Sequence, residues 1–463
     1  MEPMTIREIL EAVGGRLLGE FGDVNRTVSR VETDSRTIHA GSLFVPLMGE
    51  RFDGHAYINS ALEGGAAGCF TQRERESYLP GKFYIKVGST QRALRDLAKY
   101  YKKKFPIPVV ALTGSVGKTT TKDMVAAVLG EKYKVLKTEG NLNNEIGVPM
   151  TLLRLGSEHE IAVLELGMNH AGEIDYLSAM VEPDAVLMTN IGDSHIEHFG
   201  SREKILEAKS EIFHHARPDA FVVINGDDPL LSTLPGRLPF SFTRIGAGEG
   251  LDYRAVDVES DGASRMTCRI VAPSGEFPVE IPALGAHMIY PTLMAAAVGE
   301  HFGLTHQQIA DGVLHFAPTK MRMNILHRGE GITILNDTYN ANPQSMRAAV
   351  QVLSGAKGEY KVAVLGDMFE LGPLAPALHA GIGDYLGKAG IDCLVAVGEL
   401  AKHIYDAAQA AGVPDCRYCP DKEAAKPVLD GVVRPGTTVL VKASRGMAME
   451  QLVDYLLGIT QEA

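Results

Sequence analysis

Short apolar runs alternate with segments whose apolar residues recur at helical spacing through the middle of the chain. The runs lie at residues 109–112, 161–166, 185–191 and 221–225. Uninterrupted apolar runs of this length are typical of strands in a parallel sheet, because helices cover both of its faces. We therefore predict an α/β domain with a parallel sheet, in which functional side chains follow the carboxyl ends of the strands.

The same pattern returns in the last third of the chain. Apolar runs at 332–335, 362–367, 394–398 and 438–442 alternate with helical segments and predict a second, Rossmann-like α/β domain. No G-x-G-x-x-G follows these runs, so they do not predict a dinucleotide site. In residues 251–283, apolar and polar residues instead alternate and turns interrupt them, which favours an antiparallel ribbon at a sheet edge.

The first residues form a smaller predicted α/β unit. Thr5 is placed to cap a short helix that ends at Gly14 and Gly15, and residues 43–47 are a strand candidate. A helix over about 91–104 then leads into the next domain. The predicted organisation is an α/β chain of three domains, which span residues 1–85, 86–317 and 318–463.

Composition narrows the possible partners and the compartment. The chain has 463 residues with 45 basic and 57 acidic side chains, which gives a formal net charge of −12. An acidic surface argues against broad nucleic-acid binding, and no apolar run is long enough to predict a membrane span. The first residues lack a signal-peptide pattern, so we expect a cytoplasmic protein. We also expect a monomer.

The cysteines carry little chemical signal. Of the five, only Cys416 and Cys419 have C-x-x-C spacing, and no second pair completes a metal site. Prolines flank this pair, so we place it in a loop rather than at the start of a β–α–β unit. We therefore predict a structural or incidental role for both cysteines.

The stretch TGSVGKTTTK at residues 113–122 carries the clearest chemical signal. It follows a predicted strand and opens a predicted helix, so backbone N–H groups and the helix dipole favour an anion there. Gly114 and Gly117 let the backbone approach phosphate oxygens, Lys118 can reach the terminal phosphates, and Thr119 can ligate Mg²⁺. The predicted nucleoside triphosphate site consists of Gly114, Ser115, Val116, Gly117, Lys118, Thr119 and Thr120.

Polar side chains at two other strand ends are candidates for the same chemistry. Glu165 lies near the end of one apolar run, His195 follows the next, and Lys209 lies on the helix after it. In the first domain, Ser35 and Arg36 supply a hydroxyl and a bidentate cation that suit a diphosphate. A capped turn with a surface arginine explains that pair equally well.

Several longer motifs resemble those of the Mur ligases. The resemblance covers nearly the whole chain, and the motifs follow the order found in that family. The motifs are TDSRTIHAGSLFVPLMGERFDGH (33–55), TGSVGKTTTK (113–122), TEGNLNNEIGVP (138–149), TNIGDSHIEHFGS (189–201), EAKSEIF (207–213), NDTYNANPQSM (336–346), GDMFELG (366–372) and KASRGMAME (442–450).

This resemblance implies a domain that binds a UDP-linked precursor, a central P-loop ATPase domain and a Rossmann-like C-terminal domain that closes over the nucleotide. It implies ATP and Mg²⁺ as cofactors, and a step of peptidoglycan precursor synthesis needed for cell shape and division. The γ-phosphate of ATP passes to a carboxylate, and an amine then attacks the acyl phosphate. The motifs are most similar to the ligase that adds D-alanyl-D-alanine to a UDP-N-acetylmuramoyl-tripeptide.

The resemblance also implies roles for single residues. The catalytic residues would be Lys118, His195 and Lys209, and the metal ligands Thr119, Glu165 and His195. Lys209 matches a lysine that is carbamylated in several Mur ligases; the alternative is a plain lysine that pairs with phosphate or with Glu207. Outside the loop, ATP would contact His287, Arg322 and Asp337, although a salt bridge between domains is the alternative for the last two. The substrates would contact Ser35, Arg36, Asn143, Asn144, Ser444 and Arg445.

One segment departs from the family pattern. The family commonly has G-x-H-N-x-x-N before a helix of small residues, whereas here Met288 and Pro291 replace both asparagines and His287 is kept. Methionine offers an apolar contact but no amide donor, so recognition of the adenine base must differ. Backbone groups are the expected replacement.

Three other functions compete with this interpretation. They are a Mur-type ligase that adds a single amino acid, a P-loop phosphotransferase, and a nucleotide-dependent binding module. NDTYNANPQSM at 336–346, together with the lack of a DNPR-like motif, favours the dipeptide over a diamino acid. Glu165, His195 and Lys209 around one phosphate loop favour ligation over the other two functions.

Overall fold

The computed structural model describes residues 1–19, 21–49 and 52–458, so Glu50 and Arg51 of the 33–55 motif lie outside the described residues. The chain forms two units. The first comprises Met1–Ala111, Tyr133–Val186 and Glu211–Ala220, and the second comprises Leu112–Lys132, Leu187–Ser210 and Phe221–Ala463.

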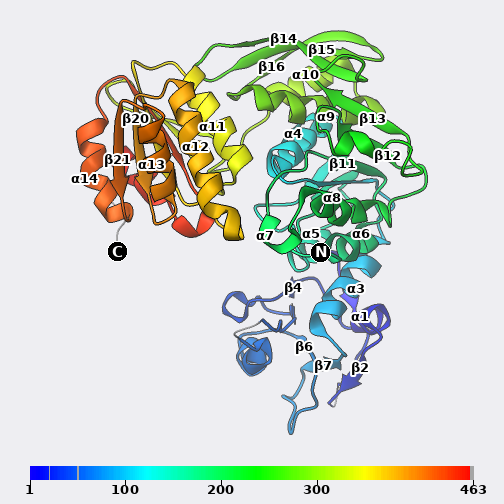
Figure 1. Cartoon of the computed structure of the whole chain (residues 1–463). Coiled ribbons are helices and arrows are strands. Elements are labelled where there is room, and N and C mark those ends of the chain that lie inside the picture. Colours follow the sequence, from blue (N-terminus) through cyan, green and yellow to red (C-terminus); the bar gives the residue numbers. More distant parts are fainter. Residues whose placement is uncertain (20, 50–51, 459–463) are drawn as a thin grey trace. The chain divides into compact units, whose positions relative to one another are not determined.

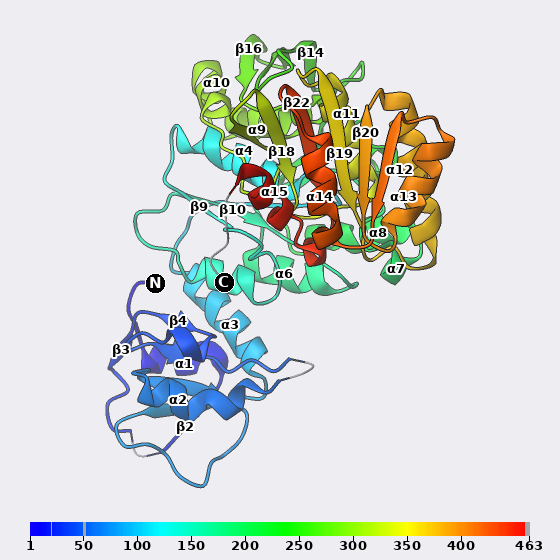
Figure 2. The same cartoon turned by 90° about the vertical axis from the view of Figure 1, so that its left-hand side faces the viewer.

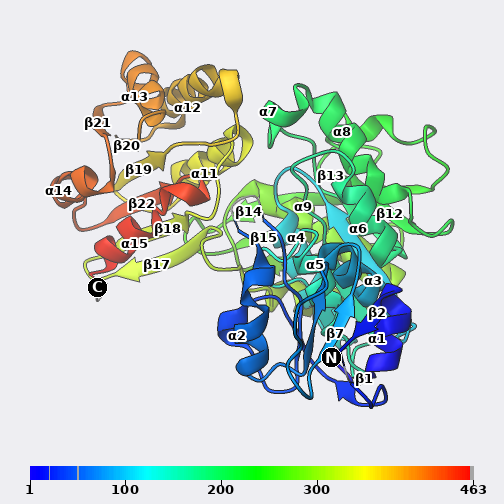
Figure 3. The ribbon, with the colours of Figure 1, turned by 90° about the horizontal axis from the view of Figure 1, so that it is seen from below.

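The first unit begins with a five-stranded sheet and a two-stranded pair. The sheet strands are β2 (Arg16–Leu18), β4 (Val31–Glu32), β5 (Leu43–Phe44), β6 (Gly68–Thr71) and β7 (Phe83–Lys86), and the pair is β1 (Met4–Thr5) with β3 (Thr27–Val28). The sheet order is β2-β7-β6-β5-β4, with only β2 antiparallel to its neighbour. Helix α2 (Ile58–Glu63) lies along these strands (Figure 3) and buries Phe44 and Tyr84 against them.

Two local sequence signals set the ends of elements in this unit. Helix α1 (Ile6–Val13) starts at a capping box between Thr5 and Glu8 and ends at Gly14, whose φ is +59°, as predicted. The strand predicted at 43–47 is shorter than expected. It stops as β5 at Phe44, because Pro46 has no N–H to continue the ladder.

The rest of the first unit carries part of a larger parallel sheet. Its strands run in the order β11-β8-β10-β9, and β9 pairs with β10 in parallel. These strands are β8 (Val109–Thr113), β9 (Val135–Lys137), β10 (Ile161–Glu165) and β11 (Ala185–Met188), and the helices around them are α3 (Thr90–Lys102), α5 (Gly147–Leu152) and α6 (Glu173–Val181). The last residues of β8 and β11 belong to the second unit.

The second unit continues from these strands into an antiparallel ribbon. β12 (Phe221–Asn225), β13 (Phe242–Gly246) and β14 (Tyr253–Ser260) pair in parallel, whereas β15 (Met266–Ala272) and β16 (Gly275–Ile281) complete a ribbon with β14. Figure 1 shows this ribbon at its top, with α10 (His306–Leu314) beside it. The ribbon predicted over 251–283 is confirmed. The helices here are α4 (Lys118–Gly130), α7 (Ile196–Phe199), α8 (Arg202–Ser210), α9 (Ile289–His301) and α10 (His306–Leu314).

The C-terminal part of the second unit is a six-stranded sheet with helices on both faces, as predicted. The strand order is β17-β18-β22-β19-β20-β21, and only the edge strand β17 is antiparallel. The strands are β17 (Asn324–Arg328), β18 (Ile332–Asp337), β19 (Tyr360–Gly366), β20 (Cys393–Val397), β21 (Asp415–Cys419) and β22 (Thr437–Lys442). One face packs on α11 (Pro343–Gly355), α12 (Ala375–Ala389) and α13 (Ala401–Ala410), and the other on α14 (Lys422–Val432) and α15 (Glu450–Leu457), which lie in front of the sheet in Figure 2.

The C-x-x-C pair lies on strand β21 and not in the loop that the flanking prolines suggested. Pro414 and Pro420 bound the strand without interrupting it, which is a position that proline tolerates. Residues three apart on a strand point to opposite faces, so Cys416 and Cys419 pack into different cores. Both thiols are free. No helix in the described part of the chain is long and apolar enough to cross a membrane.

Candidate active site

The phosphate loop joins β8, which is buried along its whole length, to the first residue of α4. Gly117 caps the helix with φ +79°, and Gly114 has φ +154°. A Cβ at residue 114 would lie 1.9 Å from the hydroxyl oxygen of Thr189. Both conformation and space therefore require glycine at this end of the loop.

The segment after β11 holds the loop in place. Asn190 accepts hydrogen bonds from Ser115 N (3.0 Å) and Val116 N (2.9 Å), through its carbonyl and side-chain oxygens respectively. The carbonyl of Val116 accepts from the Thr189 hydroxyl at 2.7 Å and from the Asn190 amide at 3.0 Å. The Gly192 N–H donates to Ser115 Oγ at 2.8 Å. The loop is therefore preorganised by residues that the sequence interpretation did not single out, although they stand in the motif at 189–201.

Lys118 extends over the loop that it follows. Its ammonium donates to the Gly114 carbonyl at 2.8 Å and lies 3.5 Å from that of Ser115. Thr119 is buried, and Thr120 is partly exposed. The predicted loop residues are thus gathered around one lysine at a helix N-terminus, which is an arrangement that favours anions.

A buried ion pair on the second turn of α4 was not predicted. Lys122 Nζ lies 3.1 Å from Asp123 Oδ1, and both side chains are less than 5% exposed. The second oxygen of Asp123 accepts a hydrogen bond from the Thr319 hydroxyl. This contact ties the phosphate-loop helix to the segment that leads into the C-terminal sheet.

Glu165 ends β10 within the first unit and is 2% exposed. Its Oε1 accepts from the Asn143 amide at 2.7 Å, and its backbone N–H donates to the Thr138 hydroxyl at 3.0 Å. Its Oε2 is buried without a hydrogen-bond partner among the described residues. A buried carboxylate oxygen that lacks a partner fits a hard cation such as Mg²⁺.

Asn144 has a different local role from its neighbour. Its side-chain oxygen accepts from the N–H groups of Ile146 and Gly147, which open α5. In the described part of the chain, no three His, Cys, Asp or Glu side chains group in a way that could hold a metal ion. The predicted metal set instead combines a hydroxyl, a carboxylate and an imidazole.

His195 precedes α7 and contacts the C-terminal part of the second unit. Its Nδ1 lies 2.7 Å from Glu370 Oε2, which is close enough for an ion pair although the atoms are not aligned for a hydrogen bond. The contact with His195 lowers the pKa of Glu370. Lys209, on α8, is only 1% exposed. Glu370 was not predicted, because nothing in the local sequence links it to His195.

The end of β18 holds a second buried ion pair. Asp337 Oδ2 accepts from Lys442 Nζ at 2.5 Å, and Asp337 Oδ1 accepts from Met323 N at 3.2 Å. Lys442 is 2% exposed and also donates to the carbonyl of Asn340 at 2.8 Å, and burial lowers its pKa. The Arg322 guanidinium stacks 4.0 Å from the centre of the Tyr339 ring. Sequence reasoning named Arg322 and Asp337 but missed Lys442, which begins the 442–450 motif.

The remaining predicted residues have diverse surroundings. Ser444 is 3% exposed, and its hydroxyl accepts from Phe369 N at 2.8 Å. Arg445 donates to Glu450 at 2.6 Å. Arg36 follows Ser35 in an exposed turn of the first unit and donates to Asp34 at 2.7 Å. His287 lies in the exposed turn before α9.

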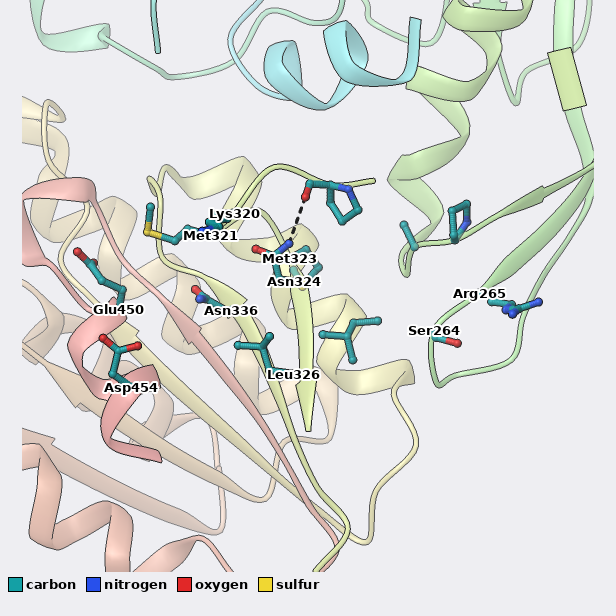
Figure 4. A pocket seen from close by; sticks show the side chains of 14 residues that line it. Ser264, Arg265, Lys320, Met321, Met323, Asn324, Leu326, Asn336, Glu450 and Asp454 are labelled. Atoms are coloured by element: carbon teal, nitrogen blue, oxygen red, sulfur yellow. Dashed lines mark hydrogen bonds between the residues drawn. The ribbon is translucent and has the colours of Figure 1, made fainter. Parts of the chain in front are cut away.

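A pocket of about 770 Å³ opens in the second unit between the ribbon turn and the strand β17 (Figure 4). Ser264 and Arg265 line one side, and Glu450 and Asp454 of α15 line the other. The predicted ATP contacts Arg322 and Asp337 are not among its lining residues, although their neighbours Met321, Met323 and Asn336 are. The pocket therefore borders the predicted nucleotide contacts without containing them.

A glycine-bounded loop between a buried parallel strand and a helix, with a lysine over it, defines a P-loop nucleotide-binding protein. The chain belongs to the Mur ligase family. Models for the Mur ligase catalytic domain, the middle domain and the glutamate ligase domain match residues 27–102, 112–299 and 321–445. This confirms the predicted family.

Curated relatives and solved structures extend the match to the full length. The chain is 38% identical to the UDP-N-acetylmuramoyl-tripeptide–D-alanyl-D-alanine ligase of Bacillus subtilis over 98% of each chain. It is 37% identical to the ligase of that name from Escherichia coli, over 98% of this chain and 99% of that one. A crystal structure of MurF from Acinetobacter baumannii superposes with a TM-score of 0.90, at 33% identity over 99% of both chains. The structure of MurF from Thermotoga maritima in complex with ADP superposes with a TM-score of 0.82, at 29% identity over 93% of this chain and 97% of that one. The three-domain α/β fold class is thereby confirmed.

Proposed function

We propose that the chain is an ATP-dependent ligase that joins D-alanyl-D-alanine to a UDP-N-acetylmuramoyl-tripeptide in peptidoglycan precursor synthesis. One observation carries this proposal. A preorganised phosphate loop lies in a chain that is 38% identical over 98% of its length to a ligase named for this reaction. ATP, the tripeptide precursor and the dipeptide are the proposed small-molecule partners, taken by a cytoplasmic monomer.

The proposed chemistry has two balanced steps. A carboxylate oxygen of the tripeptide bonds to the γ-phosphorus of ATP, and ADP leaves as the bond to the β-phosphate oxygen breaks. The amine nitrogen of the dipeptide then bonds to the acyl carbon, phosphate leaves with its oxygen, and the nitrogen loses a proton. Lys118 and the loop N–H groups would neutralise charge on the transferring phosphoryl group.

The metal proposal rests on the donors that this chain offers. Thr119 and Glu165 would hold Mg²⁺, with His195 as a further ligand by the family resemblance. The buried Glu165 Oε2 has no hydrogen-bond partner among the described residues, which supports this choice. The bound ion would supply positive charge at the phosphates. Asn143 would orient the Glu165 carboxylate through its 2.7 Å hydrogen bond.

The carbamylated lysine belongs to the same proposal. The neutral amine of Lys209 would bond to the carbon of CO₂ and lose a proton, which gives a carboxylate on a long stem. Lys209 is 1% exposed, and the reaction with CO₂ requires the neutral form of its amine. The domain boundaries 1–85, 86–317 and 318–463 are also proposed. The family matches support the last two, although the first match runs on to residue 102.

Release of ADP and phosphate, measured with and without each substrate, tests the reaction. We expect phosphate release only when UDP-N-acetylmuramoyl-tripeptide and D-alanyl-D-alanine are both present, with an amide product seen by mass spectrometry. A phosphotransferase would form ADP without the dipeptide and keep the phosphate on its product. A ligase for one amino acid would accept a free amino acid in place of the dipeptide. Either result would refute the proposal.

A further inference from the structure

A second pocket, of about 390 Å³, lies within the first unit, where α3 ends and β8 begins. No predicted catalytic, nucleotide or substrate residue lines it. Three cations contribute to its wall, together with two carboxylates and an apolar segment. The cations are Lys102, Lys103 and Arg217, the carboxylates are Glu182 and Asp184, and the apolar segment is 105–108.

Lys102 is the unusual member of this group. It is the last residue of α3 and is only 7% exposed. Its ammonium has no hydrogen bond or ion pair with any residue that the structure describes. Burial lowers the pKa of Lys102. A buried charge is costly unless a counter-charge joins it, so this lysine favours an anion beside it.

The two carboxylates of the pocket already have partners. Asp184 accepts from Val109 N at 2.8 Å with one oxygen and pairs with Arg217 Nε at 2.9 Å with the other. Glu182 pairs with Lys99 Nζ at 3.0 Å. They attract Lys102 at longer range but leave its donors unused. Positive charge therefore remains in excess at this pocket.

The size and the wall of the pocket indicate more than a simple ion. Small-molecule sites typically enclose about 300 to 1,000 Å³, and a lone phosphate would fill only part of this volume. Phe105, Pro106 and Pro108 offer apolar surface beside the cations. We propose that this pocket binds a small organic anion, whose carboxylate or phosphate group pairs with Lys102 while its apolar part packs on residues 105–108.

Calorimetric titration of the full chain tests this proposal, with the nucleotide site filled by excess ADP and Mg²⁺. The probes are phenyl phosphate, benzoate, inorganic phosphate and phenol. Lys102→Met removes the charge at similar volume. Lys104→Met is the matched control, because Lys104 lies two residues further on, pairs with Glu8 and does not line the pocket.

We expect phenyl phosphate or benzoate to bind the parent and the Lys104→Met variant with equal affinity. The affinity of the Lys102→Met variant should be at least roughly tenfold lower, because a charge-assisted hydrogen bond is lost. The tighter of the two probes identifies the preferred acid group. Phenol should not bind, and inorganic phosphate should bind more weakly than phenyl phosphate. Equal binding of both organic anions by Lys102→Met and the parent would overturn the site. Equal binding of inorganic and phenyl phosphate would overturn the apolar contact.

Thermal unfolding provides a second measurement. Lys102→Met should be at least as stable as the parent, since it removes a buried charge without a partner. The bound anion should raise the melting temperature of the parent but not that of the variant. If Lys102→Met fails to fold, Lys102→Gln makes the same comparison. An equal shift in the parent and the folded variant would contradict the proposal.

Discussion

His195 Nδ1 lies 2.7 Å from Glu370 Oε2, and both residues have left-handed backbone, with φ of +62° and +63°. Such a conformation costs a residue other than glycine about 1–2 kcal/mol. Strain of this kind persists where surrounding structure imposes it, often at functional sites. The loop of Glu370 is held at its two preceding residues, because Met368 N donates to His379 Nε2 and Phe369 N donates to Ser444 Oγ.

Two substitutions at residue 370 separate the effect of losing the carboxylate from the effect of backbone strain. Glu370→Ala and Glu370→Gly both remove the contact with His195, but only glycine relaxes the backbone. We expect both to lower kcat by about tenfold, as loss of a charged contact would. Glu370→Gly should unfold at a higher temperature than Glu370→Ala. Full activity in both variants would show that the contact has no part in the reaction.

Lys118→Ala should abolish most turnover. No other residue of the loop carries a positive charge, and loss of one such donor typically costs about 10² to 10³ in rate. Steady-state phosphate release measures the effect, and an unchanged melting temperature shows that the fold is intact. Activity within a few-fold of the parent would remove the phosphate-loop assignment.

Thr189 should act on nucleotide binding through the loop. Thr189→Val keeps the shape but removes the hydroxyl that donates to the Val116 carbonyl at 2.7 Å. We expect the KM for ATP to rise by about fivefold to tenfold, because the loop loses a partly buried hydrogen bond. Thr189→Ser keeps the donor and should stay close to the parent. Equal KM values for the two variants would argue against this positioning role.

Lys209→Ala tests the proposed carbamate. If a carboxylate is needed there, the variant should lose most activity, and acetate should restore part of it by filling the vacated space. Lys209→Glu should be a poorer substitute because its stem is shorter. A lack of rescue, together with a bare amine in the intact mass of the parent, would reduce Lys209 to a phosphate-pairing or structural role.

His379 should make the stability depend on pH. It is fully buried, accepts from Met368 N at 2.9 Å and contacts the Ala375 carbonyl at 2.7 Å, so the neutral ring fits this site. Burial lowers the pKa of His379 below its ordinary value of 6.5. The unfolded chain therefore binds the proton first as the pH falls. The stability that the neutral ring contributes is complete above pH 6.5 and is lost below it, by at most about 1.4 kcal/mol per pH unit.

Thermal unfolding between pH 7.5 and 5.5 measures this dependence. His379→Gln should be less stable than the parent at pH 7.5, yet lose less stability on acidification, since it cannot take up the proton. The difference between the two slopes isolates this residue from the other histidines. If stability falls with pH equally in the parent and in His379→Gln, protonation of His379 does not cause the loss of stability.

Local patterns predicted the strands and the phosphate loop, because a few consecutive residues are enough to indicate each of them. A run of apolar residues indicates a strand buried on both faces, and the glycines indicate the turn of the loop. All eight central and C-terminal apolar runs that we used correspond to strands, with ends shifted by a few residues. The hydrogen bonds of Thr189 and Asn190 to the loop join residues 73 and 74 positions apart. Only the pairing of whole strands brings them together, so no local signal reveals them.

The ion pairs also join residues that are distant in sequence, so local patterns could not predict them. Asp337 and Lys442 stand 105 positions apart, at the ends of two strands that turn out to be neighbours. His195 and Glu370 come from separate parts of the second unit. Sequence reasoning found one member of each pair as a candidate and could not supply the partner. The flanking prolines of Cys416 and Cys419 misled it in a different way, because proline marks the ends of a strand as well as a loop.

The buried ion pair of Lys122 and Asp123 on α4 has a mechanical consequence. Asp123 is fixed by Lys122 on its own helix and accepts a hydrogen bond from Thr319, so residue 319 moves with the phosphate-loop helix. Any rotation of the C-terminal sheet must then take place beyond this anchor. The next residues include Met321 and Met323, whose φ values are +62° and +51°. A rotation of this kind would pivot at these two left-handed residues, and Pro318 would stay with the phosphate-loop helix.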